Sequence, residues 1–370
     1  MSRSAPGGAA AAHYAIAGGG LCGRLLAWRL ALAGHRVTLA DRGHADMRED
    51  ARPAAAHVAA AMLAPLAESA ISEPMLTRLG AASLPLWTQW IAELNRHAAK
   101  PVFLQRAGSL ILWHRQDRDE AQRFAQRLDP TAAGSATERV DAARIAELEP
   151  QLGARFAQGL YLPGEGQLDN RGLLDALAAE LRRLGVDLRW GEETDPDTLR
   201  KRCGADWGVD CRGLGAKPDM PALRGVRGEV IRVHSEEIRL HRPVRLIHPR
   251  YPIYIAPKPE GVFVIGATEL ESEDDGPATV RSALELLSAA HSLHPAFGEA
   301  RILEIAANRR PALPDNLPRV EQAGAGLLRI NGLYRHGFMI APAVVENALG
   351  MLDALRKDAA SLAPGAAIAH

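Results

Sequence analysis

Three glycines between an apolar strand and an apolar helix constrain the fold of this chain more than any other feature. They form a G-x-G-x-x-G pattern at Gly18, Gly20 and Gly23. Residues 13–17 before the pattern predict a short buried strand, and leucines at helical spacing from Leu21 predict a helix after it. An alternating run at 36–40 predicts a second strand that finishes at Asp41. The unit is therefore strand, helix and strand within about 30 residues, the arrangement of dinucleotide-binding folds.

Each glycine of the pattern has a physical task in such a fold. Gly18 permits the tight turn, Gly20 lets the backbone approach a pyrophosphate, and Gly23 lets the helix lie close to the sheet. The helix N-terminus adds positive potential, and Asp41 can accept hydrogen bonds from ribose hydroxyls. A glycine-rich turn without a ligand is the alternative, and the pattern alone leaves NAD and FAD both open.

Length and composition exclude several other classes of protein. The chain has 370 residues, which suggests two domains or one large domain with an insertion. Its 44 basic and 44 acidic residues leave no net charge, so we expect no nucleic-acid partner. Three cysteines are too few for a disulfide framework or a four-thiolate zinc site, and we expect no metal. No apolar run approaches the roughly 20 residues of a spanning helix, and the N-terminus lacks a signal-peptide pattern. We therefore expect a cytoplasmic protein with no membrane span.

The later segments predict a second, sheet-based part of the fold. Residues 73–97 predict a helix, and 101–114 predict a hairpin of two strands. Residues 226–270 are rich in strands, with a hairpin turn at 258–261. A last helix should begin near Pro342 or Ala343. Together these patterns predict a mixed α/β and α+β fold, in which a discontinuous Rossmann-like domain carries a second domain built on a mixed or antiparallel sheet.

The predicted division of the chain follows from this alternation. The nucleotide-binding domain should comprise residues 13–75, 145–225 and 305–365. The second, sheet-based domain should comprise residues 76–144 and 226–304. A ligand held between the two domains would contact both.

Seven segments carry a resemblance that covers most of the chain. They lie at 18–41, 57–68, 165–170, 209–216, 262–269, 308–318 and 333–342. In that order they resemble the D-amino acid oxidase superfamily of FAD-dependent oxidoreductases, and most of all the glycine oxidases of thiamine biosynthesis. The resemblance implies FAD in an extended pose, with its ring system between the nucleotide domain and the substrate domain.

The same resemblance implies a set of residues around the substrate. Arg310 and Arg335 fall at the positions of two substrate-side arginines, whose planar guanidinium groups suit a carboxylate. Tyr254 matches a tyrosine that points at the substrate, and Glu269 stands where relatives have an apolar residue. The competing interpretations are surface charge for the arginines and a half-buried sheet aromatic for the tyrosine.

Cofactor contacts follow from the resemblance as well. The amides of Gly337, Phe338 and Met339 can face the flavin pyrimidine edge, where reduction places negative charge. The other residues assigned to the cofactor are Arg42, Ala61, Met62, Gly213, Gly215 and His336. His57 lies near the position of a histidine that tethers flavin in some relatives, but one residue away from it. We therefore expect noncovalent FAD.

The implied reaction is FAD-dependent oxidative deamination of glycine or a small related amino acid such as sarcosine or D-alanine. Hydride passes to flavin N5, the resulting imine hydrolyses, and thiamine thiazole synthesis is the expected use. Glu269 should favour glycine and sarcosine, with D-aspartate last, since like charges repel in a partly buried site. The electron acceptor, oxygen or another, stays open, and so does the oligomeric state, a homo-oligomer included. The alternatives are a D-amino acid dehydrogenase with a non-oxygen acceptor and a noncatalytic flavin-binding protein.

Overall fold

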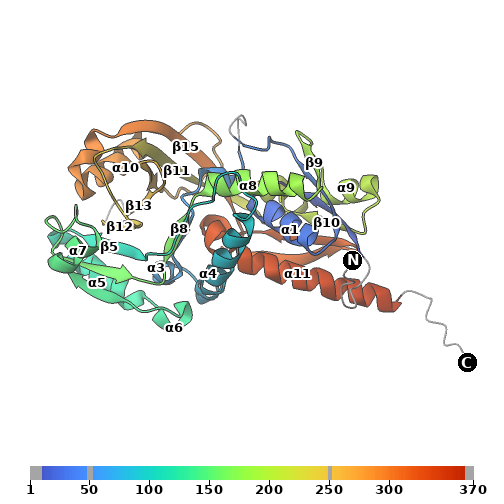
Figure 1. Cartoon of the computed structure of the whole chain (residues 1–370), viewed down its shortest axis with the longest axis horizontal. Helices are drawn as coiled ribbons and strands as arrows, with labels where there is room; N and C mark the ends of the chain where they lie inside the picture. The colour runs from blue at the N-terminus through green and yellow to red at the C-terminus, as the bar shows by residue number, and fades with distance from the viewer. Residues whose placement is uncertain (1–10, 48–52, 249–251, 363–370) are drawn as a thin grey trace, which may run out of the picture.

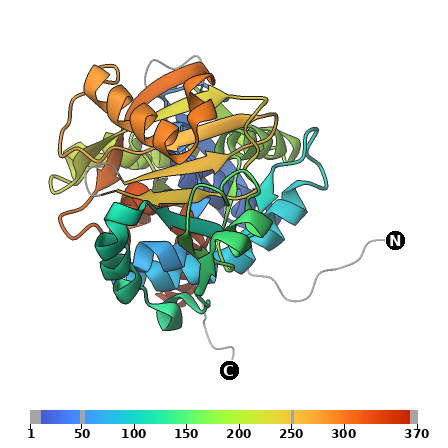
Figure 2. The ribbon, with the colours of Figure 1, turned by 90° about the vertical axis from the view of Figure 1, so that its left-hand side faces the viewer.

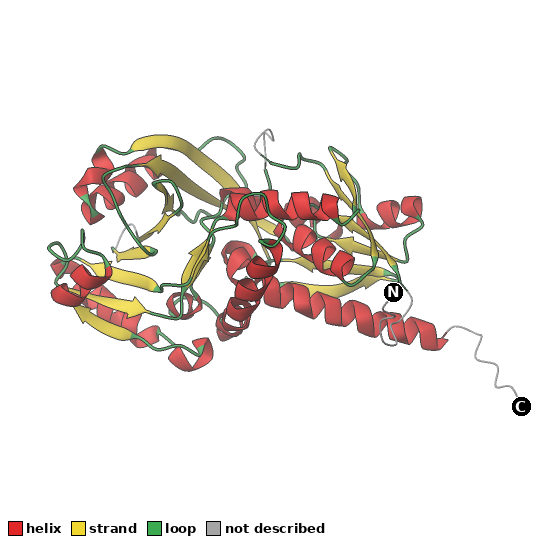
Figure 3. Cartoon of the chain, viewed as in Figure 1, coloured by secondary structure: helices red, strands yellow, loops and turns green. Residues whose placement is uncertain are grey.

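Two large sheets lie along the long axis of the molecule, with a small third sheet between them (Figure 1, Figure 3). The computed structural model describes residues 11–47, 53–248 and 252–362. This arrangement confirms the predicted fold class: one sheet is mostly parallel and covered by helices, and the other is mixed and mainly antiparallel.

The predicted domain boundaries stay a prediction. The predicted ranges 13–75, 226–304 and 305–365 each include some residues outside the described part of the chain. The expectation about a signal peptide also concerns residues 1–10, which lie outside it.

The six-stranded sheet contains the predicted strand, helix and strand unit. Its strands run in the order β16-β17-β10-β1-β2-β9, parallel throughout except for the β16–β17 pair. β1 is entirely buried, as a central parallel strand covered on both faces should be. The strand bounds are β1 (His13–Ala17), β2 (Arg36–Asp41), β9 (Asp187–Trp190), β10 (Trp207–Asp210), β16 (Arg319–Gly324) and β17 (Leu327–Asn331).

Five helices surround this sheet. α1 packs against α8 and α11, α11 packs against α4, and α9 contacts β1 (Figure 1). Asp169 caps α8 by accepting hydrogen bonds from the first amides of that helix. The helix bounds are α1 (Leu21–Leu32), α4 (Pro74–Leu94), α8 (Asn170–Arg183), α9 (Pro196–Cys203) and α11 (Gly337–Leu362).

The eight-stranded sheet forms the other end of the molecule. Its order is β15-β11-β14-β13-β12-β5-β7-β6, antiparallel except for the β12–β5 pair. β13 and β14 confirm the predicted hairpin at 258–261. Figure 2 shows the orange helix α10 (Val280–Leu293) along one side of these strands. The strand bounds are β5 (Ser109–Trp113), β6 (Glu138–Asp141), β7 (Gln158–Leu162), β11 (Arg224–His234), β12 (Val244–Ile247), β13 (Ile253–Pro257), β14 (Val262–Gly266) and β15 (Arg301–Ala312).

Short helices complete this end of the molecule and its connections. The α-helices are α2 (Ala55–Val58), α3 (Pro65–Ser69), α5 (Arg118–Arg127), α6 (Pro130–Ala133) and α7 (Ala142–Leu148). The 3-10 helices are η1 (Arg115–Asp117), η2 (Gly213–Asp219), η3 (Pro295–Gly298) and η4 (Tyr334–His336).

The hairpin predicted at 101–114 is wrong. Its two strands exist, but β4 (Leu104–Gln105) pairs with β8 (Gly166–Leu168) in the small sheet, whereas β5 pairs with β7 and β12. β3 (Met62–Leu63) is the third strand of the small sheet. The turn between β4 and β5 passes the chain from one sheet to another, because local alternation predicts a strand but not its partner.

The last helix also differs from its predicted start. α11 begins at Gly337, five residues before Pro342, which therefore lies inside the helix. Proline has no N–H to donate to the carbonyl four residues earlier. Here that carbonyl belongs to Phe338, and the indole Nε1 of Trp87 donates to it at 2.7 Å. A side chain from α4 thus replaces the helix hydrogen bond that Pro342 cannot make.

α11 meets the length and composition of a membrane-spanning helix, which the sequence pattern had not suggested. The stretch is Tyr334–Asp358, with a mean hydropathy of 1.4 and half of its apolar window buried. It packs on α4 and α1 within the core around the six-stranded sheet. A core helix satisfies the same length and composition, so the contacts favour a core role.

Candidate active site

One cavity of about 680 Å³ brings most of the predicted site residues together. Its volume is within the usual range of about 300–1,000 Å³ for ligand sites. The predicted residues that line it are Gly20, Asp41, Arg42, Ala61, Met62, Gly213, Gly215, Tyr254, Glu269, Arg310, Arg335, His336, Gly337, Phe338 and Met339. Gly18, Gly23 and His57 do not line it.

The glycine pattern is built as a dinucleotide corner. Gly18 has a φ of 106°, and a Cβ there would lie 2.4 Å from the carbonyl carbon of Cys211. A Cβ on Gly23 would lie 1.8 Å from the Gly18 oxygen, so both positions exclude any side chain. The nearest contact of a Cβ on Gly20 is Ala54 at 3.7 Å, which leaves room on the cavity side. The corner therefore fits a close-lying pyrophosphate.

Asp41 is held next to this corner by two backbone amides. Its Oδ2 accepts from Gly19 N at 2.5 Å and its Oδ1 accepts from Gly43 N at 2.7 Å. A carboxylate can accept about four hydrogen bonds, so capacity is left for hydroxyl groups in the cavity.

Arg24 supports the corner and was missed by sequence reasoning. It is fully buried on α1 and donates to the carbonyls of Gly19, Leu174 and Ala45, each at 2.7 Å. Its guanidinium carbon also lies 4.8 Å from the centre of the Trp190 ring. The one available signal was a charged side chain in a mainly apolar helix, which by itself does not identify a partner.

Lys258 is a second supporting residue that the sequence did not reveal. Its buried Nζ donates to Ala60 O and Leu168 O at 2.7 Å and to Gln167 Oε1 at 3.1 Å. Burial lowers the pKa of Lys258 to about 7, but these three acceptors use all three ammonium protons and so favour the charged form. The contacts fix the chain just before Ala61, which has a φ of 53° and lines the cavity.

The first turn of α11 faces the same cavity. Gly337, Phe338 and Met339 are the first three helical residues, so their amides have no partner within the helix. These amides and the helix dipole favour negative charge in front of them. His336 precedes them; burial, the largest influence, lowers its pKa to about 4, so its ring is neutral at pH 7.

Arg310 lies on β15 with its guanidinium over the backbone of β11. A Cβ on Gly228 would lie 2.1 Å from Arg310 Nη2, so a side chain at position 228 would displace the guanidinium. Arg310 donates to Thr268 O at 3.1 Å and Arg227 O at 3.4 Å. Among the residues that the structure describes, no carboxylate lies within 4 Å of it. Tyr254 lines the same region, and burial raises its pKa, so its hydroxyl stays protonated.

Arg335 differs from Arg310 because two carboxylates form ion pairs with it. Its Nη1 lies 2.9 Å from Glu269 Oε2, and its Nη2 lies 3.2 Å from Glu68 Oε2. Glu68 also pairs with Arg245 at 2.5 Å. Burial would raise the pKa of Glu68, but Arg245 and Arg335 outweigh it and lower that pKa to about 2. Glu68 was not predicted as a site residue, although it ends one of the segments that carry the resemblance.

Glu269 is ionised for similar reasons. Burial would raise its pKa, but a hydrogen bond from Tyr334 and the charge of Arg335 outweigh burial and lower it. Its side chain is 46% exposed, against 14% for Glu68. Of the two predicted arginines at the substrate end, Arg310 therefore has no carboxylate partner among the described residues, whereas Arg335 is neutralised.

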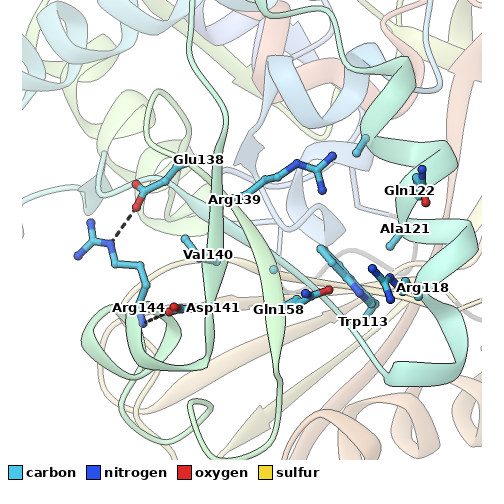
Figure 4. A pocket seen from close by; sticks show the side chains of 12 residues that line it. Trp113, Arg118, Ala121, Gln122, Glu138, Arg139, Val140, Asp141, Arg144 and Gln158 are labelled. Atoms are coloured by element: carbon cyan, nitrogen blue, oxygen red, sulfur yellow. Dashed lines mark hydrogen bonds and ion pairs between the residues drawn. The ribbon is translucent and has the colours of Figure 1, made fainter.

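A second hollow, of about 630 Å³, lies beside the edge strand β6 (Figure 4). Arg118 and Gln122 of α5 and Arg139 of β6 line it, and it contains none of the predicted site residues. Figure 4 shows Arg144 paired with Glu138. Within the described part of the chain, no group of three His, Cys, Asp or Glu residues could hold a metal.

Known proteins resemble this chain over nearly its whole length. The family model described as FAD dependent oxidoreductase (DAO) matches residues 13–346. A protein named "Putative thiamine biosynthesis oxidoreductase ThiO" from Rhizobium etli is 43% identical over 330 residues, covering 89% of this chain and 93% of the relative.

Two solved structures share the fold. Glycine oxidase from Geobacillus kaustophilus has a TM-score of 0.77 at 24% identity, with 94% of this chain and 95% of that chain covered. Iminodiacetate oxidase from Chelativorans sp. BNC1 has a TM-score of 0.73 at 21% identity, with 92% and 95% covered. The family match, the Rhizobium relative and the dinucleotide corner lead to one conclusion: the chain belongs to the DAO family of FAD dependent oxidoreductases and is an FAD-dependent enzyme.

Proposed function

We propose that this enzyme oxidises the α-amine of a small amino acid, glycine or sarcosine first and D-alanine next. The imine product would hydrolyse in water. The names of the Rhizobium relative and of the Geobacillus neighbour support this substrate class and a place in thiamine biosynthesis. Membership in a family of oxidoreductases favours an enzyme over a noncatalytic flavin-binding protein.

The observation that carries the proposal is the unpaired guanidinium of Arg310 in the same cavity as the dinucleotide corner. Arg310 is only partly exposed, and a substrate carboxylate would supply the counter-charge that its guanidinium lacks. Tyr254 can donate a hydrogen bond to the same ligand, since its raised pKa keeps the hydroxyl protonated.

The residues present fit FAD. When bound, FAD supplies the hydride acceptor at ring atom N5. Gly20, Asp41 and Arg42 would hold the adenosine and pyrophosphate portion. The first-turn amides of α11 would stabilise negative charge on the ring system. The cofactor residues that would line the path between these two ends are Ala61, Met62, Gly213, Gly215 and His336.

Three described groups at the substrate end could carry a proton, those of Tyr254, His336 and Glu269, and the pKa of each lies away from neutral pH. Tyr254 stays protonated, His336 stays neutral and Glu269 stays ionised at pH 7. The substrate amine must therefore lose its proton to solvent or arrive neutral before hydride transfer. Flavin reduction should accelerate with rising pH as more of the amine becomes neutral.

Anaerobic flavin bleaching tests the proposal. Glycine, sarcosine, D-alanine and D-aspartate are mixed with the holoenzyme, and loss of the flavin absorbance is followed by stopped flow. Bleaching by glycine or sarcosine is expected, and no bleaching by any amino acid would refute the proposal. Admitting oxygen then separates an oxidase, whose colour returns quickly, from a dehydrogenase that needs another acceptor.

A further inference from the structure

Arg335 suggests what kind of substrate the site rejects. We propose that Glu269 occupies the place on Arg335 that a second substrate carboxylate would take, so the native site selects amines with one carboxylate. This inference rests on the proposed function. It assigns Arg310 alone to the substrate carboxylate and makes Glu269 a specificity-determining residue.

The charges at the substrate end of the cavity favour a substrate with one carboxylate over a substrate with two. Three guanidinium groups, those of Arg245, Arg310 and Arg335, face two ionised carboxylates, those of Glu68 and Glu269. One positive charge is left uncompensated, and it belongs to Arg310. A single carboxylate would neutralise the group, whereas a second one would add an uncompensated negative charge.

The polar contacts of Arg335 lead to the same conclusion. Its Nη1 contacts Glu269, its Nη2 contacts Glu68 and, at 3.3 Å, the Ser72 hydroxyl, and its Nε points at His336 Nε2 at 3.4 Å. All three nitrogens are engaged. A second ligand carboxylate would have to displace one of the two protein carboxylates.

Glu269 is the carboxylate that can be exchanged. Glu68 is mostly buried and also holds Arg245 at 2.5 Å, so moving it would break two ion pairs. Glu269 is half exposed, and Arg335 is its one ion-pair partner among the described residues. Glu269 also directly follows Thr268, whose carbonyl accepts from Arg310. The two arginines therefore both contact the segment just after β14, where an amine with a carboxylate on each arm could contact both.

The test uses Glu269→Gln, which keeps the shape of the side chain and removes its charge. The probes are methoxyacetate, with one carboxylate, and oxydiacetate, with two. An ether oxygen replaces the amine in both, so neither can be oxidised, and binding is read from the change in flavin absorbance of the holoenzyme. The matched control is Glu271→Gln, because Glu271 is exposed, pairs with Arg224 and does not line the cavity.

The native protein should bind methoxyacetate at least tenfold more tightly than oxydiacetate. Glu269→Gln should shift this ratio at least tenfold toward oxydiacetate, which corresponds to about 1.4 kcal/mol, and Glu271→Gln should leave the ratio unchanged. A ratio in Glu269→Gln within twofold of native, native preference for oxydiacetate, or no native binding of methoxyacetate would each overturn the inference.

These binding ratios do not depend on turnover. If no amino acid bleaches the flavin, the proposed function fails even where the ratios behave as expected. If glycine bleaches the flavin but the ratio does not shift, only the role of Glu269 fails. Where both hold, Glu269→Gln should also gain flavin reduction by iminodiacetate relative to sarcosine.

Discussion

Arg310→Leu should remove the substrate carboxylate site and leave the cofactor in place. Within the described ranges, the guanidinium donates to two backbone carbonyls, at 3.1 and 3.4 Å, and to no side chain, so the fold depends little on its charge. Binding of the substrate carboxylate would depend on the charge of Arg310 far more than the fold does. Leucine keeps part of the apolar stem and supplies no donor.

The expected loss of substrate affinity in Arg310→Leu follows from the charge pair that Arg310 would form with the substrate carboxylate. Arg310 is half-buried, and a bound substrate would cover it further. Removing one partner of a charge pair that is buried in the complex costs about 3–5 kcal/mol. At about 1.4 kcal/mol per factor of ten, substrate affinity should fall roughly 10²-fold to 10³-fold or more. Gly228→Ala is a second variant, which keeps the charge but displaces it, because a Cβ there would lie 2.1 Å from Nη2. A misplaced group can cost as much as about 10²-fold.

Anaerobic stopped-flow reduction, with the amino acid concentration varied, measures the substrate dissociation constant and the rate of flavin reduction. The FAD content of each variant is measured in parallel and should be native. Arg319→Leu is the matched control, because Arg319 is a surface arginine paired with Asp315. Native reduction kinetics in Arg310→Leu at low substrate would refute the assignment. A native dissociation constant in Gly228→Ala would refute the geometry.

Three further predictions concern the cofactor and the ion pairs. Asp41→Ala should weaken FAD binding by about 1.5–3 kcal/mol, the value of hydrogen bonds to a charged group, and an unchanged FAD dissociation constant would exclude Asp41 from the site. Acid precipitation should release intact FAD into the supernatant, whereas flavin that stays with the chain would indicate a tether at His57. Glu68 has a folded pKa of about 2 against an ordinary 4.5, so its stabilisation is present above pH 4.5 and is lost as pH falls toward 2. The difference is worth about 3 kcal/mol, and Glu68→Gln should therefore flatten this acid limb when unfolding is followed by urea titration at each pH.

Local patterns predicted those parts of the site that lie in one continuous segment. The glycine pattern, the second strand and Asp41 occupy 24 consecutive positions, and the hydrophobic periods around them identify each element without reference to the rest of the chain. The hairpin at 258–261 is predictable for the same reason. Arg310 and Tyr254 came from the resemblance, since no local rule separates them from other arginines and tyrosines.

Residues that act through distant partners could not be found in this way. Lys258 contacts a loop nearly 200 positions earlier, and Glu68 meets Arg245 and Arg335 only in the folded chain. A single sequence specifies the charge of such residues but not their neighbours. For this reason the sequence identified Arg335 as a site residue but could not predict that two carboxylates pair with it.

The start of α11 shows how one distant contact changes the chemistry of the site. A proline normally ends or begins a helix, so the local rule placed the helix start near Pro342 and left Gly337 to Met339 in a loop. Trp87 donates to the Phe338 carbonyl, and Ser83 accepts from the Ala343 amide at 3.1 Å, so α4 stabilises the turn around the proline. The helix therefore extends toward the cavity, and its first turn lines the place where the proposed reaction puts negative charge. A tryptophan more than 200 residues away from Pro342 thus determines where that electrostatic stabilisation lies.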